Sequence, residues 1–115
     1  MKILVVVNHS PWGGSLGTTA LRLVRAMLGD GLGLAAVFFR EEGAYHALPG
    51  RDSDSGCPDL DAAWRELAAA HDVPLLVCSS AAARRLPTAP GMPFREAGLA
   101  ELFELMTACD RVVGF

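Results

Sequence analysis

The stretch VPLLVCSSAAARR, residues 73–85, changes pattern in its middle. Residues 73–77 form a short, continuous apolar run, which is typical of a strand buried on both faces of a parallel sheet. Small and helix-forming side chains follow, and they predict a short helix over residues 79–85. A buried strand that leads directly into a helix indicates an α/β architecture, and Cys78 stands where the two elements meet.

The same alternation continues on both sides of this stretch. Further strands are predicted at 2–8 (KILVVVN), 34–39 (LAAVFF) and 111–115 (RVVGF). Residues 40–58 contain several Gly, Pro and Asp residues, so we expect a long loop with one helical turn near 44–47. Residues 86–96 are expected to form a Pro-rich connector.

Three longer helices are predicted between the strands. The first is capped by Thr18 or Thr19 and ends at Gly31, and the second begins at Asp59 or Asp61. The third is an amphipathic helix over residues 98–109. Together these elements predict a single domain over residues 1–115, a three-layer α/β/α fold around a parallel sheet of about four to five strands, with flavodoxin-like layering. Ligands of such sheets bind at the carboxyl ends of the strands.

Composition limits the classes of partner. The net charge is −3, and no segment gathers the Lys and Arg residues that neutralise phosphates, which argues against direct nucleic-acid binding. The hydrophobic fraction of 51% is slightly above ordinary usage and favours an oligomer. A chain of this size has limited capacity to hide large apolar side chains, so several of them are expected at subunit contacts. The candidates are Trp12, Phe38, Phe39, Leu48, Phe94, Phe103, Met106 and Phe115.

The apolar runs are all far shorter than a membrane-spanning helix requires, so no membrane association is expected. KILVVVN follows Met1 at once and lacks the features of a secretory signal, which predicts a cytoplasmic protein. Cys57, Cys78 and Cys109 are odd in number and have no CxxC spacing. This argues against a disulfide framework and against a zinc site, so we expect three free thiols.

Cys78 is the main candidate for chemistry. Its predicted place, at the carboxyl end of a strand and before a helix, offers unpaired N–H groups that stabilise a thiolate. A thiolate stabilised in this way is nucleophilic near neutral pH. The alternative is that Cys78 is only a small buried apolar residue, which is the commonest role of a free cysteine. Arg84 and Arg85 lie at the far end of the short helix, where we interpret them as charges that attract the substrate.

Three further features could contribute to a site at this edge of the sheet. The loop HSPWGGSLGTT lies where α/β proteins bind phosphates, but it lacks both the dinucleotide glycine spacing and the P-loop lysine. We therefore expect its glycines to serve backbone geometry, and Trp12 to cover an interface or the mouth of the site. His9 and His46 could accept the Cys78 proton, although a solvated or hydrogen-bonded loop histidine is the simpler interpretation.

Several segments of the chain together resemble the DsrE/TusD family of sulfur-relay proteins, and most of all its TusD members. They are the first strand, FFREEGAYHA at 38–47, the helix around Trp64, VCSSAAARR at 77–85 and CDRVVGF at 109–115. This resemblance implies a DsrEFH-like fold and a persulfide relay in which Cys78 carries the sulfur. We expect substrate-binding or supporting roles around that cysteine for Ser79, Tyr45, His9, Arg84 and Arg85.

The resemblance implies a sulfurtransferase that takes sulfur from one carrier protein and passes it to the next. Such a relay serves tRNA 2-thiouridine synthesis or sulfur oxidation, and it needs no metal or organic cofactor. The expected partners are sulfur-carrier proteins and sister subunits, assembled as a homo- or hetero-oligomer, either a trimer or a hexamer. The alternative is a non-catalytic subunit of the same fold, for assembly or for binding a small ligand, in which the cysteine only packs.

Overall fold

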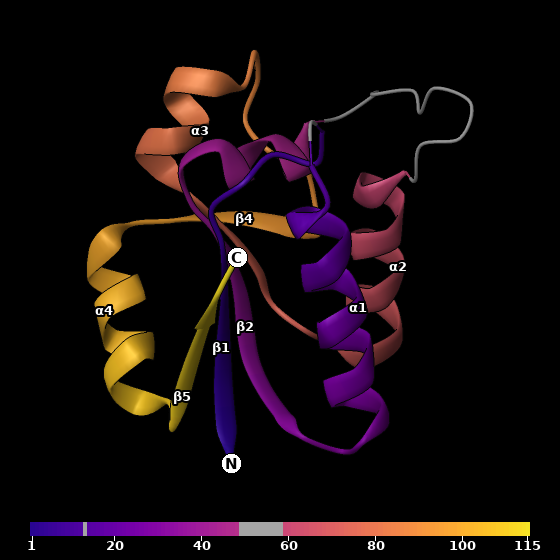
Figure 1. The fold of residues 1–115 in the computed structure, drawn as a ribbon. Coiled ribbons are helices and arrows are strands. Elements are labelled where there is room, and N and C mark those ends of the chain that lie inside the picture. Colours follow the sequence, from indigo (N-terminus) through magenta and orange to yellow (C-terminus); the bar gives the residue numbers. More distant parts are fainter. Residues whose placement is uncertain (13, 49–58) are drawn as a thin grey trace.

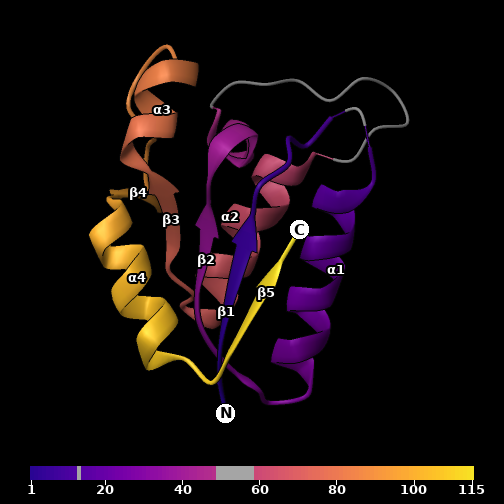
Figure 2. The same ribbon diagram turned by 60° about the vertical axis from the view of Figure 1, so that its left-hand side comes forward.

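The centre of the molecule is a five-stranded parallel sheet with strand order β4-β3-β2-β1-β5. The computed structural model describes residues 1–12, 14–48 and 59–115. The strands are β1 (Lys2–Val7), β2 (Gly33–Phe39), β3 (Leu75–Cys78), β4 (Phe94–Ala97) and β5 (Arg111–Gly114). Because all five run in the same direction, their carboxyl ends share one edge of the sheet, at the top of Figures 1 and 2.

Helices lie on both faces of this sheet, which confirms the predicted three-layer α/β/α fold. α1 (Leu16–Gly29) and α2 (Leu60–His71) pack side by side on one face, and α4 (Leu99–Ala108) covers the other (Figure 1). A 3₁₀ helix, η1 (Glu41–Ala47), and the short helix α3 (Ser79–Arg85) lie above the carboxyl edge. The carboxyl edge is therefore built by short elements rather than by the long helices.

The observed ends of α1 and α2 agree with the predicted ends, except at the start of α1. α1 begins at Leu16 after Ser15, earlier than the predicted caps. The Thr19 hydroxyl donates a hydrogen bond to the Ser15 carbonyl one turn back, which places Thr19 inside the helix. Gly31 ends α1 as predicted, with a φ of 75° that favours glycine. Asp59 caps α2, since its carboxylate accepts the Ala62 N–H at 3.2 Å.

A second correction concerns the predicted connector at 86–96. Its last residues belong to β4, an edge strand that pairs with β3 through Leu75–Phe94 and Cys78–Ala97. The FREA segment buries its two ends and exposes both charged residues between them, so it lacks the alternation that identifies a strand. Pairing with β3 fixes its conformation, and the charged side chains suit an edge.

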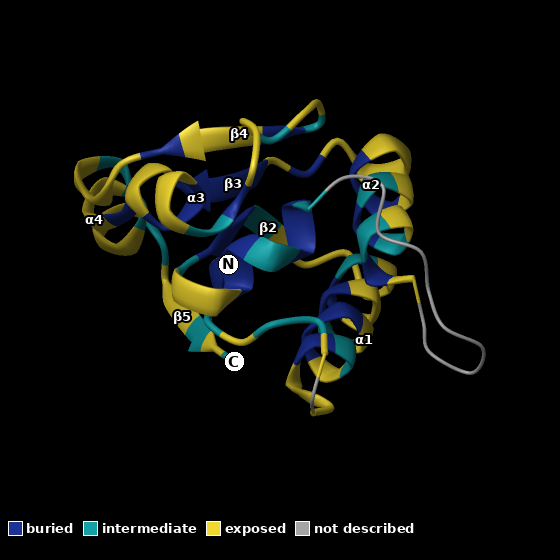
Figure 3. Ribbon diagram, turned by 90° about the horizontal axis from the view of Figure 1, so that it is seen from above, coloured by how far each residue is buried: buried dark blue, intermediate teal, exposed yellow. Residues whose placement is uncertain are grey.

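The hydrophobic core is formed by residues of this one chain. β3 is entirely buried, and so are β1 after Lys2 and the last four residues of β2. Figure 3 shows the buried β3 from above the carboxyl edge. Phe39 packs edge-on against Trp64 and Phe94, with ring centroids 5.3 and 5.8 Å apart. Of the apolar residues expected at subunit contacts, Phe38, Phe39 and Phe94 are thus already covered within the chain. Trp12, Phe103 and Met106 are exposed.

Candidate functional site

Cys78 occupies the predicted junction between strand and helix. It is the last residue of β3 and the N-cap of α3. Its neighbour across the sheet is Ala97 of β4, and α3 packs against η1, the short helix that follows β2. The exposed fraction of Cys78 is 5%, so its sulfur lies just beneath the surface of the carboxyl edge.

The Cys78 sulfur is surrounded by hydrogen-bond donors that favour its anion. Burial acts to raise the pKa of the thiol, but the Ser80 hydroxyl, 3.3 Å from Sγ, acts to lower it. The backbone N–H groups of Ala81 and Ser80 and the charge of Arg40 lower it further. The net result is a pKa below its ordinary value, which increases the thiolate fraction near neutral pH.

Ser80, rather than Ser79, is the serine that contacts the sulfur. Ser79 is exposed at the start of α3, while Ser80 turns its hydroxyl back to Cys78. Helix-cap geometry also brings an N-cap side chain close to the N–H groups two and three residues later. With Cys78 as the cap, those residues are Ser80 and Ala81. The position of Cys78 directly before the predicted helix was thus the sequence signal that could have identified Ser80 and Ala81 as donors.

Arg40 is a site residue that the sequence prediction missed. It follows β2 directly, and β2 pairs with β3 so that Phe39 lies opposite Val77. The next residues along the two strands are Arg40 and Cys78, so the two meet at the same edge. Their proximity depends on the lateral order of the strands, which the sequence pattern alone does not give.

The two arginines of α3 do not contact the Cys78 sulfur. Arg84 is exposed, and Arg85 lies at the far end of α3, with a guanidinium nitrogen 3.6 Å from the Glu41 carboxylate of η1. Neither belongs to the groups that shift the pKa of Cys78. That the two arginines attract an incoming partner stays a prediction. The ion pair between Arg85 and Glu41 connects α3 to η1.

His9 and Tyr45 gather beside the end of β1. A hollow of about 380 Å³ is lined there by His9, Ser10, Trp12, Gly14, Leu16 and Glu42. Tyr45 packs edge-on against Trp12, with ring centroids 5.1 Å apart, and Trp12 remains 46% exposed. Cys78 does not line this hollow, and within the described residues His9 is not a hydrogen-bond partner of its sulfur.

His46 is a buried structural histidine. Its Nδ1 accepts a hydrogen bond from the Trp64 indole N–H at 3.1 Å, so the ring proton is on Nε2 and is donated to the His9 carbonyl at 3.0 Å. These bonds connect η1, α2 and the loop after β1. His46 is therefore a hydrogen-bonded histidine, as the simpler interpretation expected. It is completely buried and not solvated.

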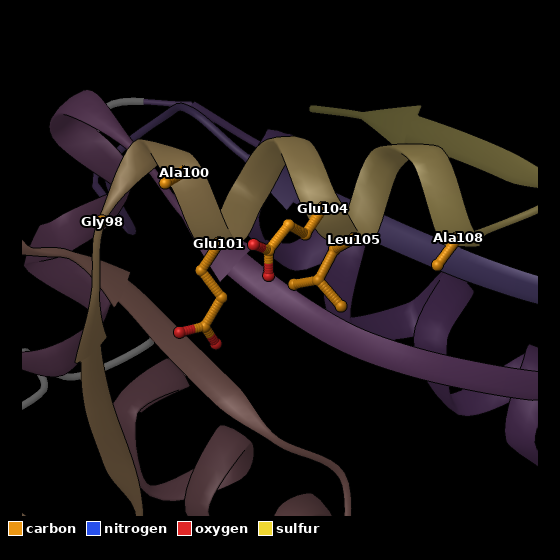
Figure 4. Close-up of a pocket in the computed structure, with 6 residues that line it drawn as sticks. All are labelled: Gly98, Ala100, Glu101, Glu104, Leu105 and Ala108. Carbon is orange, nitrogen blue, oxygen red and sulfur yellow. The ribbon is translucent and has the colours of Figure 1, made fainter.

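Another hollow lies beside α4, on the outer layer of the fold. Its volume is about 640 Å³, and it is lined by Gly98, Ala100, Glu101, Glu104, Leu105 and Ala108 (Figure 4). All of these residues come from one helix or its cap, and none is a nucleophile. The hollow therefore offers no chemistry comparable to that at Cys78.

The described residues form no metal-binding cluster. Within residues 1–12, 14–48 and 59–115, no three His, Cys, Asp or Glu side chains are grouped to hold a metal ion. Cys78 and Cys109 are free thiols, and Cys57 lies outside the described residues. No helix in the described part of the chain is long and apolar enough to cross a membrane.

Comparisons with known proteins agree with this fold and with the resemblance. Proteins named Sulfurtransferase TusD from Salmonella newport and Salmonella paratyphi B are both 36% identical to this chain over 128 aligned positions, covering 100% of each sequence. The crystal structure of the ychN protein from E. coli superposes with a TM-score of 0.88 and 25% identity, covering 100% of this chain and 99% of that one. The sequence profile of the DsrE/DsrF-like family matches residues 1–115, and the chain belongs to this family.

Proposed function

We propose that this chain is a sulfurtransferase subunit of a sulfur relay, in which Cys78 carries sulfur as a persulfide between carrier proteins. The observation that carries the proposal is the set of donors around the Cys78 sulfur, which lowers the pKa of the thiol despite its burial. The full-length similarity to proteins named sulfurtransferase supports the same activity. A relay needs a reactive thiolate and a docking surface, and it needs no cofactor.

Uptake is a displacement at sulfur. The Cys78 thiolate attacks the outer sulfur of a donor persulfide, R–S–SH. A bond forms between Cys78 Sγ and that sulfur while the S–S bond of the donor breaks, and its electron pair leaves with the donor as R–S⁻. The products are the Cys78 persulfide and the donor thiolate, so charge is conserved and no separate oxidant or reductant is consumed.

Discharge repeats the step with the roles exchanged. The thiolate of an acceptor attacks the outer sulfur of the Cys78 persulfide, and Cys78 leaves as a thiolate. A lower pKa of the leaving thiol makes it leave faster. The donors from Ser80 and Ala81 therefore assist both halves of the relay, since the same anion is formed or consumed in each.

The partners follow from the proposed chemistry and from the family. Donor and acceptor are sulfur-carrier proteins, and sister DsrE-like subunits complete the assembly. Two uses of the sulfur fit this relay, tRNA 2-thiouridine synthesis and sulfur oxidation. The acceptor that discharges Cys78 decides between them, and a pull-down from the native host read by mass spectrometry identifies it.

Intact-mass spectrometry tests the proposed activity. The protein is incubated with glutathione persulfide, desalted, and then exposed to an excess of glutathione as a low-mass acceptor. The wild type should gain the mass of one sulfur atom and lose it again with the acceptor. Cys78→Ser should gain nothing, while the matched control Cys109→Ser should behave as the wild type.

The competing function is a non-catalytic subunit of the same fold, for assembly or for binding a small ligand. In that case Cys78 is 5% exposed only because it packs in the core, as free cysteines commonly do. The same experiment separates the two functions. A Cys78 thiol that takes up no sulfur and is alkylated only slowly at neutral pH supports the non-catalytic subunit.

A further inference from the structure

The backbone of Arg40 is fixed between β1 and η1. Its N–H donates a hydrogen bond to the Val7 carbonyl at 2.9 Å, and its φ and ψ of −115° and 161° continue the extended conformation of β2. The next residue, Glu41, has a φ of 49°, a left-handed conformation that is uncommon for a residue with a side chain. The chain thus turns sharply after Arg40, at the edge where β3 ends in Cys78.

The Arg40 guanidinium contains a buried donor without an acceptor. Its Nε is inaccessible to solvent and has no hydrogen-bond partner among the described residues. The neighbouring Glu41 carboxylate lies against Arg85 instead. A buried donor of this kind is costly when it stays unpaired, and a guanidinium is suited to binding anions.

An anion near this donor is supplied by the proposed reaction. The pairing of β2 with β3 places Arg40 beside Cys78, and the charge of Arg40 already lowers the pKa of the thiol. When Cys78 becomes a persulfide, the added sulfur extends about 2.05 Å beyond Sγ. An S–SH group is more acidic than a thiol, so the negative charge moves onto this outer sulfur.

We propose that the Arg40 guanidinium, through its buried Nε–H, binds the negatively charged outer sulfur of the Cys78 persulfide. This inference rests on the proposed function and names the residue that holds the transferred atom. The bond stabilises the loaded state relative to the free donor persulfide. Arg40 therefore assists loading, and the twin arginines of α3 do not take this role, because Arg85 contacts Glu41 and Arg84 faces solvent.

The experiment measures the sulfur-exchange equilibrium between glutathione persulfide and Cys78, at a fixed ratio of glutathione persulfide to glutathione. The loaded fraction is read by intact-mass spectrometry for the wild type, Arg40→Gln, Arg40→Lys and a control, Arg22→Gln, at an exposed position of α1. The equilibrium constant should fall about tenfold in Arg40→Gln, the equivalent of one charge-assisted hydrogen bond. Arg22→Gln should match the wild type, and Arg40→Lys should recover part of the loss, because it retains the charge.

The outcomes separate this inference from the function on which it rests. If the wild type loads sulfur and Arg40→Gln has the same equilibrium constant, the role of Arg40 is overturned while the relay stands. If the wild type takes up no sulfur, the relay itself fails. If Arg40→Gln does not fold, Arg40→Lys decides: an equilibrium constant equal to that of the wild type contradicts binding through Nε–H, and a lower one supports it.

Discussion

At the scale of single residues, the pKa of Cys78 depends mainly on hydrogen-bond donors two and three residues further along the chain. Burial of a thiol by itself raises its pKa and makes it inert. Here the Ser80 hydroxyl, the N–H groups of Ala81 and Ser80 and the charge of Arg40 together outweigh that effect. Cys78 is thus only 5% exposed and yet has a lowered pKa, which is what the proposed relay requires of its nucleophile.

The contribution of Ser80 is tested by a matched pair of serine variants. Ser80→Ala removes the hydroxyl 3.3 Å from Sγ, so the pKa of Cys78 should rise and alkylation at neutral pH should slow by about three- to tenfold. Ser79→Ala removes an exposed hydroxyl and should leave the rate unchanged. The rate with iodoacetamide, followed by mass spectrometry, is the measurement. Equal slowing in both variants would assign the effect to the helix rather than to the hydroxyl.

The lowered pKa of Cys78 also predicts how stability varies with pH. The folded state releases the thiol proton at lower pH than the unfolded chain, for which the ordinary value is 9.0. The stabilisation is therefore absent below the folded pKa and grows as the pH rises toward 9.0. Urea unfolding under reducing conditions should show the wild type gaining stability over Cys78→Ser across this range. A difference that is constant or shrinks with rising pH would refute the lowered pKa.

At the scale of elements, η1 connects the candidate site to the rest of the molecule. It packs against α3, lies close to the end of β1, and holds His46 in hydrogen bonds to Trp64 and the His9 carbonyl. Its close approach to β1 requires Gly43, because a Cβ there would lie 2.0 Å from the Val7 carbonyl oxygen. The position of Arg40 therefore depends on a glycine three residues away.

Substitution of this glycine tests the role of η1. Gly43→Ala forces the backbone of η1 and β1 apart and should lower the free energy of unfolding by about 3 kcal/mol. The control is Gly91→Ala, where a Cβ meets nothing within 4 Å, and it should change stability by less than about 0.5 kcal/mol. Urea denaturation measures both. Similar losses of unfolding free energy in the two variants would show that the backbone of η1 can shift to accommodate the Cβ, and that η1 does not fix the carboxyl edge of the sheet.

Local sequence patterns predicted the junction at Cys78 but only part of its surroundings. The apolar run before Cys78 and the small residues after it identify β3 and α3, because both signals lie within one short segment. Arg40 was missed because its proximity to Cys78 arises from the pairing of β2 with β3, a long-range contact. β4 was missed for the same reason, since its conformation depends on its neighbour more than on its own residues.

At the scale of the whole molecule, three of the apolar side chains expected at subunit contacts are exposed. Phe103 and Met106 on α4 are 62% and 42% exposed, and Trp12 lies exposed at the carboxyl edge. The aromatic residues of β2 and β4 are covered within the chain and are not available for subunit contacts. The surface available for subunit contacts is thus smaller than the composition suggested.

A stable assembly should be visible in solution. Light scattering at micromolar concentration should give the mass of a trimer or hexamer, which is a multiple of 12.1 kDa for this chain alone. With sister subunits present, the mass should again be well above that of one chain. Phe103→Glu places a charge on the exposed face of α4 and should lower the mass if this face is a contact. A single species near 12.1 kDa, both alone and with the native partners, would contradict assembly.

The most direct measurement locates the transferred sulfur within the chain. After incubation with glutathione persulfide, all thiols and persulfides are trapped by alkylation, and the peptides that contain Cys57, Cys78 and Cys109 are mapped by mass spectrometry. We predict the added sulfur on the Cys78 peptide, with the other two cysteines recovered as plain thiols. Added sulfur on Cys57 or Cys109 with Cys78 recovered as a plain thiol, or no added sulfur at all, would contradict the role of Cys78.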